Sequence, residues 1–138
     1  MARVNLITLH FADNNGSALQ AYATCRILRD LGHQVTVINL QNKSTMLGRY
    51  KHLSSWKYAP RYLNFWRFQH RYMAPMTQRM FEVDTSKISP CEYTIVGSDQ
   101  TWNADFEIVK RGVYFLNFVN DGSQKIALAS SFGKAEWE

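Results

Sequence analysis

The stretch NNGSALQAYATCRILRDLG, residues 14–32, decides the fold that we expect for this chain. It directly follows an apolar run, residues 4–9, which is typical of a buried strand. In α/β proteins, binding sites at the carboxyl end of a strand are commonly built from an apolar strand, a small polar turn and a following helix. We therefore expect a binding site at residues 14–17. Backbone N–H groups at the positive end of the helix could hold an anion or a sugar hydroxyl there.

Local signals predict where this helix begins and ends. The three residues before Ser17 tolerate the positive φ values of a tight turn. Ser17 is expected to cap the helix, with Gln20 completing a capping box, and Gly32 is expected to end it. The apolar residues at helical spacing, which we expect to face the core, are Leu19, Tyr22, Ala23, Ile27 and Leu31.

Similar patterns predict the remaining elements. Further strands are expected at residues 34–40, 93–96 and 125–130. Residues 113–119 are either a strand or a loop with aromatic anchors, and residues 60–73 have helical spacing that Pro75 should end. The sequence therefore predicts an α/β fold over residues 1–138, with a Rossmann-like, mostly parallel sheet and flanking helices.

Composition limits the class of protein. The chain has 138 residues, of which 46% are hydrophobic and 20% charged, as in a globular domain. Its apolar runs are shorter than the roughly 20 residues of a membrane-spanning helix, and its first residues do not resemble a signal peptide. Cys25 and Cys91 are too few for a disulfide framework, so we expect reduced thiols and a cytoplasmic location. The four histidines lack metal-ligand spacing, so we expect no metal.

The net charge of +5 is concentrated in the middle of the chain. No acidic residue lies between Asp30 and Glu82, an interval with eight lysines and arginines. We expect residues 43–81 to form a basic, aromatic, helical insertion. Within it, residues 49–79 could bind a polyanion such as nucleic acid or lie on an anionic membrane surface. The interpretation we favour is an amphipathic arm with its aromatic side chains turned inward, and we expect no nucleic acid as partner.

Two later turns resemble the first one. The sequence GSDQTWN, residues 97–103, follows the expected strand at 93–96, and SSFG, residues 130–133, follows the strand at 125–130. Because parallel strands end on the same side of a sheet, we expect the three polar turns to converge on one crevice. The candidate binding residues are Asn15, Gly16, Ser17, Ser98, Asp99, Gln100, Asn103 and Ser131.

The types of these residues limit the chemistry. Asp99 could act as a general base, bind and orient a sugar hydroxyl, or cap a helix or brace its loop. Trp102 could be a stacking platform for a sugar ring or part of the core, and we favour binding because polar residues surround it in the sequence. Ser98 lacks the G-x-S-x-G setting of a nucleophile. The G-x-G-x-x-G and G-x-x-x-x-G-K-[ST] patterns are also absent, which argues against a dehydrogenase or a P-loop NTPase.

Three segments in this order resemble the polysaccharide pyruvyl transferase family. They are NNGSALQAYATCRILRDLGHQVTVINL, then YTIVGSDQTWN, and finally YFLNFV followed by KIALASSFG. In the first, Asn15 stands where the family commonly has an aromatic residue. The resemblance implies an enzyme that transfers the pyruvyl group of phosphoenolpyruvate to a sugar of a surface or extracellular polysaccharide, with no cofactor besides this donor.

The resemblance also implies a two-domain layout like that of glycosyltransferases with two Rossmann-like halves, known as GT-B. This chain would be the amino-terminal half, which holds a lipid-linked or polymeric acceptor and is inactive alone. The donor phosphate and the general acid would belong to a second half. Uncovered sheet surface would then favour a homodimer, and the enzyme would work at the inner face of the membrane. The alternatives are half of another sugar or nucleotide-sugar transferase, or a polyanion-binding module that uses residues 49–79.

Overall fold

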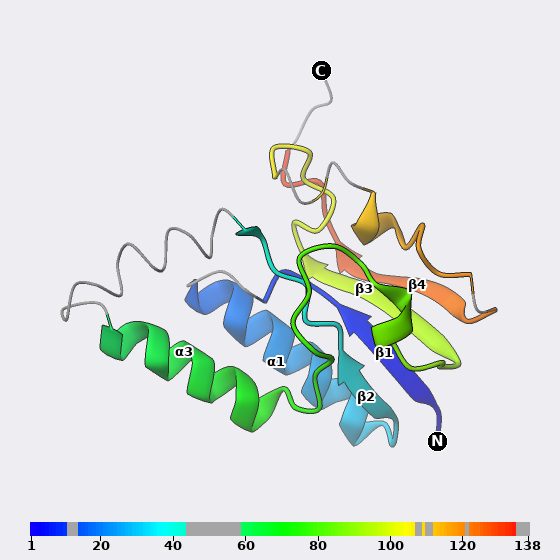
Figure 1. Ribbon diagram of the computed structural model, residues 1–138, viewed down its shortest axis with the longest axis horizontal. Coiled ribbons are helices and arrows are strands. Elements are labelled where there is room, and N and C mark those ends of the chain that lie inside the picture. The colour runs from blue at the N-terminus through cyan, green and yellow to red at the C-terminus, as the bar shows by residue number, and fades with distance from the viewer. Residues whose placement is uncertain (11–13, 44–58, 107–108, 110–111, 121, 135–138) are drawn as a thin grey trace.

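The computed structural model describes residues 1–10, 14–43, 59–106, 109, 112–120 and 122–134. Its centre is a parallel sheet with the strand order β2-β1-β3-β4 (Figure 1). The strands are β1 (Arg3–Ile7), β2 (Gln34–Val37), β3 (Tyr93–Asp99) and β4 (Gln124–Ser130). The predicted α/β fold with a parallel sheet is therefore confirmed, and the three candidate polar turns follow β1, β3 and β4.

Helix α1 (Asn15–Asp30) begins before the predicted start, because its N-cap is Asn14 and not Ser17. Asn14 has an extended backbone, and its side-chain oxygen accepts a hydrogen bond of 2.8 Å from the Gly16 N–H. Asparagine caps a helix as well as serine does. Gly16 therefore lies within the helix, and the positive φ values expected before Ser17 do not occur. The helix ends as predicted, with Gly32 at a φ of 85°.

The buried face of α1 differs from the predicted one. The residues of α1 that are buried are Ser17, Ala18, Ala21, Thr24, Cys25 and Leu28. In contrast, Leu19, Ile27 and Leu31, which were predicted to face the core, are 58%, 58% and 68% exposed. The prediction was wrong because the helix packs directly against β2 and β3. A close approach between a helix and a sheet selects small side chains on the facing side.

Helix α3 (Ala59–Tyr72) confirms the helix predicted over residues 60–73, and it packs on α1, which separates it from the sheet (Figure 1). The Tyr22 ring of α1 makes edge contacts with the rings of Phe68 and Tyr72, at 5.7 and 5.6 Å between centroids. The Arg29 guanidinium of α1 donates to the carbonyl oxygens of Tyr72 and of the two residues after it. These bonds satisfy carbonyl groups at the carboxyl end of α3.

The other face of the sheet is covered by irregular segments. The chain after α3 runs beside the end of β2, with bridges from Val37 to Met76 and from Leu40 to Met80. The 3₁₀ helices η1 (Thr85–Lys87) and η2 (Val113–Phe115) follow. Residues 113–119 therefore form a loop with buried anchors and not a strand. The core on this face contains Ile7, Leu9, Ile38, Leu40, Met80, Val96, Val109, Val113, Tyr114, Leu116 and Val119.

Strand β4 lies at one edge of the sheet and is exposed along its length, apart from the half-buried Ser130. Its two larger apolar side chains, Ile126 and Leu128, are 38% and 40% exposed. This matches the uncovered sheet surface that we expected, while the homodimer remains a prediction. Among the described residues, no helix has both the length and the apolar character needed to cross a bilayer.

Candidate functional site

The three polar turns predicted to converge do meet at the carboxyl edge of the sheet. The Ser17 hydroxyl, at the start of α1, donates a hydrogen bond of 3.0 Å to Oδ2 of Asp99, at the end of β3. The Ser131 N–H, just after β4, donates to the Asp99 carbonyl oxygen at 3.0 Å. In return, the Ser131 carbonyl oxygen accepts from the Trp102 N–H at 3.1 Å. The first, second and third turns are thus joined through direct hydrogen bonds, with Asp99 at the centre.

The end of β3 has an unusual backbone. Gly97 has a φ of 124°, its peptide bond to Ser98 is cis, and a Cβ atom at Gly97 would overlap the Leu128 carbonyl oxygen of β4. Only glycine fits there. Asp99 has a φ of 93°, and Ala129 on the neighbouring strand has a φ of 49°. Residues other than glycine rarely adopt such values, and where they persist they cluster at functional sites. The backbone conformation of Asp99 fixes the direction in which its side chain leaves the strand.

The carboxylate of Asp99 is held by both of its oxygen atoms. Oδ1 accepts a hydrogen bond of 2.8 Å from the Gln100 N–H, and Oδ2 accepts the bond from Ser17. The side chain is half-buried, so one side of it still reaches solvent. An ionised carboxylate has about four acceptor positions, of which these bonds use two. Asp99 is therefore oriented in advance and can accept a further hydrogen bond from a hydroxyl group of a ligand.

A glutamine from α1 connects the ends of β1 and β3. The Gln20 amide nitrogen donates to the Thr8 hydroxyl at 2.9 Å and to the Ser17 carbonyl at 3.0 Å. Its amide oxygen accepts from the Ser98 hydroxyl at 2.9 Å. Sequence reasoning assigned Gln20 to a capping box and missed this role. Its place one turn after Ser17, on the same side of the helix, was the available signal.

The predicted residues Gln100 and Asn103 brace each other. The Asn103 amide donates to the Gln100 side-chain oxygen at 3.0 Å, while its own oxygen accepts from the Asp105 N–H. Asn103 is buried, Gln100 is exposed, and Gly133 lies so close that a Cβ atom there would be 2.5 Å from the Gln100 oxygen. Asn103 therefore supports the loop, and Gln100 is the member of the pair that a ligand can reach.

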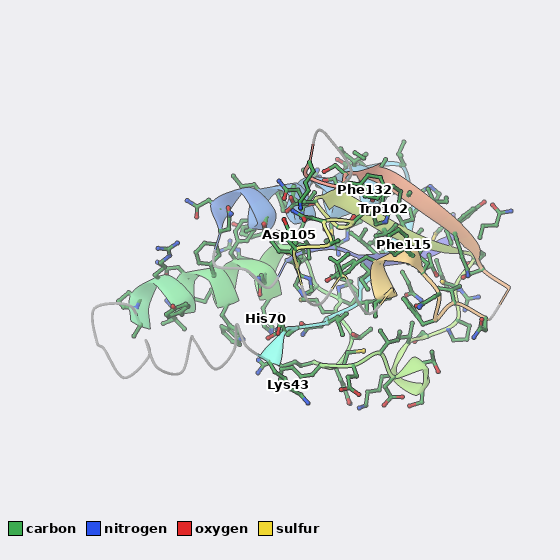
Figure 2. The ribbon with its side chains drawn as sticks, turned by 90° about the horizontal axis from the view of Figure 1, so that it is seen from above. Lys43, His70, Trp102, Asp105, Phe115 and Phe132 are labelled. Atoms are coloured by element: carbon green, nitrogen blue, oxygen red, sulfur yellow. The ribbon has the colours of Figure 1, made fainter. Side chains whose placement is uncertain are left out.

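Trp102 belongs to an aromatic group and is half-buried. Its indole N–H donates to the Tyr114 carbonyl oxygen at 2.9 Å. Its ring stacks on Phe115, with 5.7 Å between centroids and planes 6° apart, and packs against Phe132 at 5.2 Å (Figure 2). Phe115 and Phe132 occupy parts of the indole surface on which a sugar would have to stack. These contacts support the core interpretation of Trp102, and the stacking platform stays a hypothesis.

The structure places Asn15 apart from Asp99. Asn15 lies on the side of α1 that faces α3, where it lines a groove of about 790 Å³ together with Leu19, Asn64 and Phe65. The Gly16 N–H donates to the side chain of Asn14, which caps the helix. Of the first turn, Ser17 alone is joined to Asp99 by a direct bond.

A second group of buried polar side chains lies at the end of β1. His10 is fully buried, with Nδ1 at 3.0 Å from the Thr8 carbonyl oxygen and Nε2 at 3.2 Å from Oδ1 of Asn39. The Gln69 amide of α3 donates to the His10 carbonyl oxygen. This bond ties α3 to the strand end that carries Thr8, so the helical arm and the site share a support.

One ion pair lies next to the third turn. Lys134, which follows the third turn, pairs with Asp105 at 3.0 Å, and both side chains are largely exposed. No three His, Cys, Asp or Glu side chains of the described residues lie together in a way that could hold a metal ion. The arrangement offers oriented oxygen and amide groups, which suit the hydroxyl groups of a sugar better than the charge of a phosphate.

The fold and this edge define an α/β domain whose parallel strands end in a polar binding site centred on one carboxylate. The chain belongs to the polysaccharide pyruvyl transferase family, because residues 14–138 match the model of that family. The resemblance inferred from three segments of the sequence is thereby confirmed, and the protein belongs to a family of transferases. No curated protein and no solved structure was found that matches this chain.

Proposed function

We propose that the site at Asp99 binds the acceptor sugar in a pyruvyl transfer whose donor is phosphoenolpyruvate. In this reaction two hydroxyl groups of one sugar become bonded to C2 of the pyruvyl unit as a ketal. One hydroxyl proton is taken up by the methylene carbon of the enol, and the phosphate leaves with the other. Asp99 accepts a hydrogen bond from an attacking hydroxyl, which orients it and raises its nucleophilicity.

The observation that carries this proposal is the fixed carboxylate of Asp99. It lies between the Ser17 hydroxyl and the Gln100 N–H, within the G-S-D-Q segment on which the family resemblance partly rests. The exposed Gln100 amide lies next to it and supplies both a donor and an acceptor for a second hydroxyl. Such adjacent groups match a diol better than a single hydroxyl.

We further propose that this domain acts as the acceptor half of a two-domain, GT-B-like enzyme. The phosphate of the donor needs cationic groups. Lys134, the cation that follows the third turn, already pairs with Asp105, which is consistent with a separate donor half. The reaction would take place in the cytoplasm, which agrees with the unpaired cysteines Cys25 and Cys91.

NMR titration of the ¹⁵N-labelled 138-residue chain tests the assignment. Suitable probes are methyl glycosides of galactose, mannose and N-acetylglucosamine, each of which offers a 4,6-diol, and phosphoenolpyruvate in a parallel titration. We expect at least one glycoside to shift the amide signals of Ser17, Asp99 and Gln100, while phosphoenolpyruvate at the same concentration leaves them in place. Shifts with phosphoenolpyruvate alone would contradict the acceptor role.

A matched pair of variants assigns the binding to Asp99. Asp99→Asn keeps the size of the side chain and removes the charge, so we expect the glycoside to bind about tenfold to a hundredfold more weakly. Asp105→Asn removes an exposed carboxylate beside the same edge, and the affinity should not change. Equal effects of the two substitutions would show that only the local charge matters and would reject a specific role for Asp99.

A further inference from the structure

Helix α3 has two faces, and its contacts with the other described elements lie on one of them. On the inner face, Phe68 and Tyr72 contact Tyr22 of α1, and Gln69 reaches the carboxyl end of β1. The opposite face points away from the domain, because α3 forms the outer layer on this side of the sheet (Figure 1). The exposed residues of this outward face are Leu63, Trp66, Arg67, His70 and Arg71.

Apolar groups form one part of the outward face. Leu63, Trp66 and His70 lie three and four residues apart, so they share one side of the helix. Leu63 is 43% exposed and Trp66 is 50% exposed. The rings of Trp66 and His70 pack together at 4.3 Å between centroids, and His70 Nδ1 lies 2.8 Å from the Trp66 carbonyl oxygen. The bulky ring pair is thus held in place at the surface.

Positive charge forms the other part. Arg67 and Arg71 are exposed, and neither makes an ion pair with any of the described residues. Helix α3 contains no aspartate or glutamate, and the chain has none from residue 31 to residue 81. The positive charge of this face is therefore not compensated by acidic groups in the sequence around it. A partner with negative charge would complement it.

We propose that the outward face of α3 binds the surface of an anionic lipid bilayer. The 14-residue helix would lie in the plane of the interface, with Leu63 and Trp66 among the upper acyl chains and the arginines at the lipid phosphates. A tryptophan beside a leucine and basic residues is the combination that such interfacial helices use. Because Gln69 and Arg29 tie α3 to β1 and α1, binding would hold the Asp99 edge close to the membrane.

The same face fits nucleic acid less well. A base that stacks on Trp66 needs a free ring face, and the His70 ring already packs on this indole. The exposed Leu63 side chain would make no favourable contact with a phosphate backbone, whereas insertion into lipid would remove its apolar surface from water. Positive charge would attract both nucleic acid and an anionic bilayer, but the apolar side chains favour the bilayer.

Vesicle flotation of the 138-residue chain tests the proposal. The probes are vesicles of phosphatidylcholine alone and vesicles with about one third phosphatidylglycerol, first at low salt and then at 0.5 M NaCl. We expect binding to the anionic vesicles only, with most of it lost at high salt. Trp66 should also enter a less polar environment, which a blue shift of the tryptophan fluorescence will report and which Trp66→Phe removes.

Matched variants locate the binding surface. The double substitution Arg67→Gln and Arg71→Gln should lower the partition onto anionic vesicles by about tenfold to thirtyfold. Each positive charge near an anionic surface makes its own contribution to the binding free energy. The control, Arg26→Gln with Lys125→Gln, removes the same charge from exposed positions on α1 and β4. It should lower the partition by no more than about threefold. Circular dichroism of each variant confirms that the helices are retained.

Several results would overturn the proposal. Equal binding to neutral and anionic vesicles would do so, as would equal losses from the two pairs of substitutions. Binding to a DNA duplex that needs Arg67 and Arg71, without binding to vesicles, would assign the face to nucleic acid instead. None of these measurements uses a sugar or phosphoenolpyruvate, so the result is independent of the function proposed for Asp99.

Discussion

Helices α1 and α3 are both amphipathic and similar in length, at 16 and 14 residues, but they bury opposite kinds of side chain. Helix α1 places small and polar residues against the sheet and turns large apolar residues outward. Helix α3 places aromatic rings against α1 and leaves a basic face in solvent. The helix that touches the sheet also carries Ser17 and Gln20 into the site. The outer helix reaches the chain just beyond β1, where Gln69 donates to the His10 carbonyl oxygen.

This difference indicates a division of roles. Substitutions on the sheet side of α1 should affect both folding and the site, because the same face supports the core and the Ser17–Asp99 bond. Substitutions on the outward face of α3 should leave folding unchanged, because those side chains have few contacts to lose. The following predictions test how far the two helices really differ.

The largest effect is expected from Leu28→Ala in α1. Leu28 is 8% exposed and packs in a core cluster with Val4 and Leu6 of β1. Removing its side chain leaves a cavity and should lower the free energy of unfolding by about 2 to 5 kcal/mol. Urea denaturation followed by circular dichroism measures this change.

Two leucines that are exposed serve as controls for Leu28. Leu19→Ala lies on the same helix, and Leu63→Ala lies on α3. Each should change the free energy of unfolding by no more than about 0.5 kcal/mol. A loss at Leu19 as large as that at Leu28 would restore the face predicted from the sequence and remove the contrast between the helices.

Much of this fold could be predicted from the sequence. The strands were predictable because short apolar runs end at glycine or small polar residues, as at residues 93–97. The meeting of the three turns followed from the parallel direction of the strands, and the Ser17–Asp99 bond confirms it. The strands depend on local sequence patterns, and the meeting of the turns depends on one rule of sheet topology. A single sequence is therefore enough to predict both.

The buried face of α1 and the role of Gln20 could not be predicted in the same way. Helical spacing fits two faces of α1, one with Leu19 and Ile27, and one with Ala21 and Leu28. Hydrophobicity favours the bulkier pair, and only contact with the sheet reveals that small residues are needed. Gln20 has an adequate local explanation as part of a capping box, which hides its bonds to other strands.

The next effect concerns pH and again lies on the sheet side of α1. Burial raises the pKa of the Cys25 thiol from 9.0 to about 11. The unfolded chain therefore loses this proton at a lower pH than the folded protein does. The contribution of Cys25 to stability should be constant below pH 9 and should then fall by about 2 to 3 kcal/mol as the pH rises to 11. Urea midpoints measured from pH 8 to pH 11 give this slope.

A variant separates Cys25 from other groups that titrate at high pH. Burial also raises the pKa of Tyr114, so the wild-type slope contains a contribution from that hydroxyl. Cys25→Ala should reduce the slope and leave the remaining part, which Tyr114→Phe then removes. An unchanged slope in Cys25→Ala would mean that the sheet side of α1 admits water and is less closely packed than the contrast with α3 requires.

The smallest effect is expected where the two helices are joined. The Arg29 guanidinium of α1 donates to the carbonyl oxygens of Tyr72, Met73 and Ala74 at 2.9, 3.1 and 2.8 Å. Arg29→Ala removes these donors, so the last turn of α3 should open more often. We expect a global loss of about 1 kcal/mol and amide hydrogen exchange in α3 that is about fivefold faster, with α1 unchanged. Arg26→Ala, which removes an exposed arginine that pairs with Asp30, should leave exchange in α3 as it is. Faster exchange in both helices after Arg29→Ala would show that α1 and α3 open as one unit, and the division of roles between them would then fail.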